Sequence, residues 1–238
     1  MIRFVLVAAL AFGGYWFFLR GGCGTRGAVA CPPAALEEGV GTTLARGDVC
    51  PSSGYLCYER KGSFQLGRWQ LDKGKLRVRV SMPDFAKGAL AKEIRDVVIE
   101  GIQAWDGHPF PIVVDTGAIP WHGWDVNVVW SVGLYNAAAG QMRVGWNVDG
   151  KRIDFNTDGL AIVVPPALGR SLDEASAEWI RAVATHEMGH ALGLTHSDNA
   201  NDVMYFQMLP GAKQRTITPR DLETVDALYQ LPNGATVQ

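Results

Sequence analysis

The chain has 238 residues, of which 47% are hydrophobic and 19% are charged, and its net charge at pH 7 is −2. This length is enough for one sizeable domain with an appendage, and the composition is that of a globular protein. Because neither charge sign dominates, the sequence gives no reason to expect a nucleic-acid partner.

An apolar run opens the chain, from Phe4 to Leu19, between Arg3 and Arg20. It is longer than the apolar region of most signal peptides and slightly short for a membrane-spanning helix. We therefore expect residues 1–22 to be a signal or a membrane anchor, and we favour the anchor. The protein would then be exported, either held at the membrane on the periplasmic or extracellular side, or secreted.

Residues 23–74 are rich in Cys, Gly and Pro, which predicts a stalk followed by a small disulfide-pinned segment. Cys50 and Cys57 predict a short loop closed by a disulfide, and Cys23 with Cys31 could close another, although other pairings stay open. Disulfides are typical of an oxidising compartment, which agrees with export.

The main domain is expected from residue 75 to residue 232, with a short tail at 233–238. Apolar residues at helical spacing predict helices at 89–105, 175–192 and 218–229. Short apolar or alternating runs predict strands at 76–81, 110–114, 126–132, 141–146, 151–155 and 161–164.

The second and third helices carry start signals. The pattern Ser171-x-x-Glu174 predicts a capping box for the second helix. Thr218 is the expected N-cap of the third, with Pro219 at its first position. Before the second helix, Asp154-x-Asn156-x-Asp158 resembles the start of a calcium loop, but we favour a turn because the twelfth position is a proline.

Three histidines lie within eleven residues of the second helix and the segment that follows it. His186 and His190 are four residues apart, about one helical turn plus roughly 40°, so both imidazoles face the same side. Gly193 can adopt a positive φ and end the helix, which allows His196 to return as a third ligand. Three neutral imidazoles without a fourth protein ligand are typical of a catalytic zinc site.

Glu187 projects beside this pair, where it can reach a water molecule held on the metal. Zinc lowers the pKa of bound water from 15.7 to about 7. Glu187 would take the proton as this zinc-bound water attacks a peptide carbonyl, and would then pass it to the leaving amine. An isolated histidine is usually structural, but the spacing of these three favours a metal site.

The extended pattern resembles the metzincin signature with its Met-turn, on the residues His186-Glu187-x-x-His190-x-x-Gly193-x-x-His196 and Met204. Ser197 directly after the third histidine, and Tyr205 directly after Met204, are similar to the matrixin branch. The resemblance covers roughly residues 75–232.

The resemblance implies an α+β metzincin domain. Its sheet would be twisted, mainly parallel and five-stranded, with one antiparallel edge strand, packed on two long helices and completed by a C-terminal helix. An extended peptide substrate would lie antiparallel to an edge strand, which we place near 161–164. Met204 would form a floor under the zinc, and Tyr205 would stand in a pocket wall made by residues 203–208.

Matrixins also carry a structural zinc bound by histidines that precede the metal-binding helix. Only His108 and His122 remain here, so we expect one catalytic zinc and no structural one, with calcium as a weaker prediction. We expect a monomer that acts as a zinc metalloendopeptidase.

Two other functions stay open. One is a non-catalytic metal-binding or peptide-binding module on the same fold, which usually lacks the glutamate that Glu187 supplies here. The other is a zinc amidase that acts on cell-wall peptides, which an activity test on sugar-linked peptides would distinguish.

Overall fold

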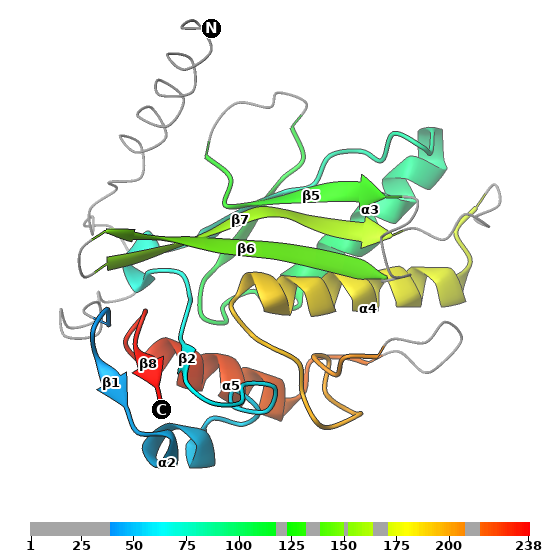
Figure 1. Ribbon diagram of the computed structural model, residues 1–238. Helices are drawn as coiled ribbons and strands as arrows, with labels where there is room; N and C mark the ends of the chain where they lie inside the picture. Colours follow the sequence, from blue (N-terminus) through cyan, green and yellow to red (C-terminus); the bar gives the residue numbers. More distant parts are fainter. Residues whose placement is uncertain (1–38, 118–122, 132–138, 150–151, 164–170, 208–214) are drawn as a thin grey trace, which may run out of the picture.

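The structure is a computed structural model that describes residues 39–117, 123–131, 139–149, 152–163, 171–207 and 215–238 (Figure 1). The apolar run, the pair Cys23 and Cys31, and His122 lie outside these described residues. Within the described part of the chain, no helix is long and apolar enough to cross a membrane.

A five-stranded sheet forms the upper layer of the molecule in Figure 1. Its strands are β3 (Leu76–Arg79), β4 (Ile112–Asp115), β5 (Val126–Ser131), β6 (Gly140–Asp149) and β7 (Arg152–Val163). They lie in the order β4-β3-β5-β7-β6, and each pair is parallel except the antiparallel pair β6–β7. This confirms the expected mainly parallel sheet with one antiparallel edge strand.

The prediction that residues 161–164 form an edge strand is wrong. The strands expected at 151–155 and 161–164 are one continuous strand, β7, which pairs with β5 on one side and β6 on the other. Among the described residues, the two edges of the sheet are β4 and β6, and β6 is the edge next to β7. The expected turn at 154–158 is also wrong, because these residues are part of β7, where a register shift next to Gly159 leaves one residue unpaired as a β-bulge.

Two long helices, α3 (Gly88–Gln103) and α4 (Glu174–Ala191), pack against each other below and behind the sheet (Figure 1). Their apolar faces are buried, as the spacing predicted. The helices approach closely at Gly101, where an added Cβ would lie 2.8 Å from the Cβ of Ala184. Only a residue without a side chain allows this contact.

Helix α4 begins later than the predicted capping box. Asp173 is the N-cap, and its carboxylate accepts a hydrogen bond from the Ser176 amide at 2.8 Å. Aspartate caps a helix as well as serine does, and Asp173 lies directly before the first helical residue, so Ser171 is left outside the helix. By contrast, α5 (Pro219–Gln230) has the expected N-cap, Thr218, in a capping box with Asp221.

The N-terminal part of the described chain folds against the C-terminus. The short strands β1 (Thr43–Leu44), β8 (Thr236–Val237) and β2 (Phe64–Gln65) form a second sheet in the order β1-β8-β2. The expected tail at 233–238 therefore contains the middle strand of this sheet. The short helix α2 (Arg46–Val49) and two 3₁₀ turns, Cys50–Ser52 and Leu71–Lys73, complete the segment.

This N-terminal segment is not a separate stalk from residue 39 onward. Tyr55, Leu56, Leu66 and Trp69 are buried in the same hydrophobic core as the two long helices. The predicted disulfide between Cys50 and Cys57 is present, with Cα atoms 5.7 Å apart. The segment is thus packed beneath the end of α4, beside the histidine-bearing turn.

Candidate metal centre

The last two turns of α4 carry His186, Glu187 and His190, and Gly193 ends the helix. Gly193 has a φ of +101°, and an added Cβ would lie 2.6 Å from the Gly67 carbonyl oxygen. Because both the backbone angle and the space require glycine, the predicted turn depends on this residue.

After this turn, the loop that carries His196 and Met204 folds back against α4. The Ser197 amide donates a hydrogen bond to the Met204 carbonyl oxygen at 2.8 Å, which fixes the loop that carries His196. Met204 is fully buried, and its thioether sulfur is the nearest atom to an added Cβ at Gly189, on α4. Met204 therefore lies against the end of α4 that carries the histidines.

The three histidines converge. Their ring centroids are 4.8 Å apart for His186 and His190, 4.8 Å for His190 and His196, and 5.4 Å for His186 and His196. One nitrogen of each lies within 4.8 Å of one nitrogen of the others. Among the described residues, this is the group of His, Cys, Asp or Glu side chains that could hold a metal ion.

Hydrogen bonds fix which nitrogen of His186 and His190 is free. His186 Nδ1 lies 2.7 Å from the Val203 carbonyl oxygen, and His190 Nδ1 lies 2.8 Å from that of Leu194. A carbonyl oxygen only accepts, so Nδ1 of each ring carries the proton and Nε2 keeps its lone pair. Burial lowers the pKa of His186 to about 4 and that of His190 to about 3, so both rings are neutral at physiological pH.

The third histidine has a different partner. His196 Nδ1 lies 2.8 Å from a carboxylate oxygen of Glu59, and the His196 amide donates to the other oxygen at 3.3 Å. A carboxylate in this position also leaves Nε2 available as a ligand. The three rings together bring three imidazole nitrogens to one place, and this donor set fits zinc.

Glu187 is buried beside the histidines, with 6% of its surface exposed. It lies against the start of β6, because an added Cβ at Gly140 would be 2.5 Å from its Cγ and 2.6 Å from its Oε1. Burial raises the pKa of Glu187 to about 8, although a hydrogen bond from the Met142 amide favours the ionised form. A cation held by the neighbouring histidines would lower this pKa again.

The buried carboxylate of Asp221 stabilises the loop that carries Val203. Asp221 is fully buried and accepts hydrogen bonds from the Tyr55 hydroxyl at 2.8 Å and from the Val203 amide at 3.1 Å. The carbonyl oxygen of the same residue, Val203, accepts the hydrogen bond from His186. Sequence reasoning missed this role of Asp221, although its place three residues after Thr218 marks it as a capping residue.

Removal of the Tyr55 hydroxyl tests how much its hydrogen bond to Asp221 stabilises the fold. We expect Tyr55→Phe to lower the free energy of unfolding by about 1.5–3 kcal/mol, because a buried hydrogen bond to a charged group is lost. Tyr58→Phe is the matched control, since Tyr58 is 48% exposed. Urea denaturation of the zinc-free protein measures both, and equal midpoints for the two variants would contradict the prediction.

Two aromatic residues of the predicted pocket wall, Tyr205 and Phe206, directly follow Met204. Tyr205 is half-buried and its ring packs on Phe206, with centroids 4.6 Å apart, while Phe206 is 55% exposed. The ring of Phe206 also faces His196, at a centroid distance of 6.5 Å. Met208, the last residue of the predicted wall, lies outside the described residues.

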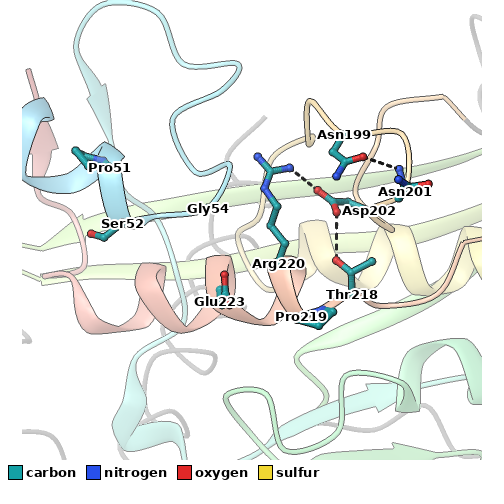
Figure 2. Close-up of a pocket in the computed structure, with 10 residues that line it drawn as sticks. All are labelled: Pro51, Ser52, Gly54, Asn199, Asn201, Asp202, Thr218, Pro219, Arg220 and Glu223. Carbon is teal, nitrogen blue, oxygen red and sulfur yellow. Dashed lines mark hydrogen bonds and ion pairs between the residues drawn. The ribbon is translucent and has the colours of Figure 1, made fainter.

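A cavity of about 550 Å³ lies on another part of the surface, between the disulfide loop, the loop after His196 and the start of α5. Figure 2 shows Arg220 and Thr218 reaching Asp202 in this hollow, with contacts of 2.6 Å and 3.2 Å. None of the three histidines lines it. The contacts of Arg220 and Thr218 with Asp202 hold the loop onto α5.

The sequence model of the matrixin peptidase family matches residues 69–230, well over half of the chain. The chain belongs to the matrixin family. Its α+β fold is therefore that of the metzincins, and its domain is of the zinc metalloprotease type. The match begins a few residues before the predicted boundary at residue 75, in the buried part of the N-terminal segment.

Two plant proteins are similar to part of this matrixin. Metalloendoproteinase 1-MMP of Arabidopsis thaliana is 34% identical over 96 residues, which are 34% of this chain and 26% of the plant protein. Metalloendoproteinase 2-MMP of the same plant is 36% identical over 67 residues, 28% of this chain and 18% of the relative. The matched region thus spans about a quarter or less of these relatives.

Among solved structures, the archaemetzincin of Methanopyrus kandleri matches 66% of this chain and 96% of its own. The two chains are 18% identical, and the superposition has a TM-score of 0.46.

Proposed function

We propose that this matrixin is a zinc-dependent endopeptidase, with His186, His190 and His196 as zinc ligands and Glu187 as general base and acid. The observation that supports this most strongly is the convergence of the three rings, each held by a hydrogen bond at Nδ1, with one nitrogen of each within 4.8 Å of the others. A structural zinc site would normally have a fourth protein ligand. Here the neighbouring acidic side chain is a buried glutamate suited to proton transfer.

Zinc held by the three rings would supply a Lewis acid that polarises the scissile carbonyl and acidifies a water molecule. Glu187 accepts the proton of the attacking water on a carboxylate oxygen and delivers it to the nitrogen of the leaving amine. The Met142 amide holds the carboxylate in place, and Gly140 leaves room for it. Met204 supports α4 from below, and Gly193 provides the turn.

In the described part of the chain, β6 is an edge strand, which supports an extended peptide as substrate. A peptide antiparallel to β6 would add a sixth strand through main-chain hydrogen bonds. The first residue of β6 lies beside Glu187, so a peptide on this edge would pass the reacting groups. We propose Tyr205 as part of the wall of the pocket that receives a substrate side chain, together with Phe206.

We also propose that the protein is exported and works as a monomer. The disulfide between Cys50 and Cys57 supports an oxidising compartment. The apolar run at 4–19 remains a sequence-based prediction of a signal or a membrane anchor.

Removal of the metal tests the proposed function. The purified chain is expected to contain one zinc and to digest an unfolded protein, to lose digestion on chelation, and to regain it with zinc but not with calcium. Digestion that chelation leaves unchanged would overturn the proposal. Cleavage of sugar-linked peptides without any digestion of unfolded protein would favour the cell-wall amidase.

A further inference from the structure

The partner of His196 comes from a distant part of the chain. Glu59 lies two residues after the disulfide cysteine Cys57, and 137 positions before the histidine. Both carboxylate oxygens are engaged, one by His196 Nδ1 at 2.8 Å and the other by the His196 amide at 3.3 Å. The carboxylate therefore fixes both the ring and the backbone of this one residue.

The two other rings have partners of a different kind. His186 and His190 donate to main-chain carbonyl oxygens of the segment that directly follows α4. Their orientation is thus a local property of the helix end and the loop. His196 stands on the loop itself, and among the three it is the histidine whose Nδ1 partner is a side-chain carboxylate.

The backbone around Glu59 is fixed on both sides. On one side, the disulfide closes the loop from Cys50 to Cys57, and Tyr55 within it is anchored to the buried Asp221. On the other, the Arg60 carbonyl oxygen accepts a hydrogen bond from the Arg46 guanidinium at 2.9 Å. The carboxylate is thus presented to His196 from a rigid support.

We propose that Glu59 is a positioning residue for the zinc site, so that the disulfide-pinned segment is a working part of that site. This inference rests on the proposed zinc-binding function. A carboxylate that accepts the Nδ1 proton of a ligating histidine fixes the ring orientation and raises the basicity of Nε2. The alternative is a surface ion pair that has no effect on zinc binding. The experiment has to exclude it, because the side chains of Glu59 and His196 are 41% and 29% exposed.

Zinc affinity of the full chain tests this, measured at neutral pH by competition with a chromophoric chelator. We expect Glu59→Ala to raise the zinc Kd by about 10- to 100-fold, the usual effect of removing such a partner. Glu59→Gln keeps an oxygen that can accept from Nδ1 but loses the charge, so its loss should be smaller than that of Glu59→Ala. Asp48→Ala is the matched control, since Asp48 is an exposed carboxylate on α2 of the same segment.

The thermal midpoint of each zinc-free variant separates positioning from stability. We expect unchanged midpoints for Glu59→Ala and Glu59→Gln together with the graded loss of zinc affinity. If Glu59→Ala unfolds, the Kd of Glu59→Gln decides. Parent-like zinc affinity in the Glu59 variants would overturn this inference alone, whereas a parent chain that binds no zinc would overturn it together with the proposed function.

Discussion

Replacement of Glu187 by glutamine is expected to lower kcat/KM for peptide cleavage by about 10²- to 10⁴-fold, the usual contribution of a general acid–base group. The zinc content should stay at the level of the parent, because the histidines and their Nδ1 partners are untouched. The measurement is the cleavage rate of an extended peptide together with metal analysis of the same samples.

Glutamine is the informative substitution because of the surroundings of Glu187. The side chain is buried between α4 and β6, where Gly140 leaves little more room than the carboxylate occupies. An amide has the same shape, and its oxygen can still accept the hydrogen bond from the Met142 amide. It cannot take a proton at neutral pH, so the substitution removes the proposed chemistry and keeps the packing.

Glu178→Gln provides the matched control. Glu178 is exposed on the same helix, so its substitution should change neither cleavage nor zinc content. A Glu187→Gln variant that cleaves peptides at the parent rate would remove Glu187 from the mechanism. A variant that also loses zinc would show that the glutamate acts on metal binding, contrary to the proposal.

The geometry of the three-histidine group was predictable because its members are close together along the chain. Helical spacing places His186 and His190 on one face, and Gly193 sets the turn that brings back the third ring. These relations need no information about the rest of the fold. Spacing alone did not point to Met204, which was expected beside the histidines only from the family resemblance.

Relations between distant segments were not predictable. The pairing of Glu59 with His196 depends on how the disulfide loop packs against the end of α4, and a single carboxylate beside a cysteine carries no sign of it. The prediction of the edge strand was wrong for a related reason. The polar stretch at 154–158 looked like a turn between two short strands, but pairing with β6 on both sides of the bulge makes it part of β7.

The pairing of β6 with β7 also underlies the second large effect on cleavage that we expect, that of Gly140→Ala. An added Cβ would lie 2.5 Å from Cγ and 2.6 Å from Oε1 of Glu187, closer than side-chain atoms approach. Because the backbone of β6 is held by its ladder with β7, the carboxylate has to move. A displacement of about 1 Å at a reacting group can lower the rate by about 10²-fold, and this is the loss of kcat/KM that we expect.

Zinc content and the thermal midpoint should remain close to those of the parent, since the atoms nearest to the added methyl group belong to Glu187 and not to the histidines. Gly47→Ala is the matched control, because an added Cβ there meets nothing within 4 Å. Parent-like cleavage by Gly140→Ala would mean that the position of the carboxylate is not critical. A loss of zinc would place Gly140 in support of the metal ligands instead. Only reduced cleavage with zinc retained agrees with a peptide-cleaving site in which β6 sets both the substrate edge and the position of the general base.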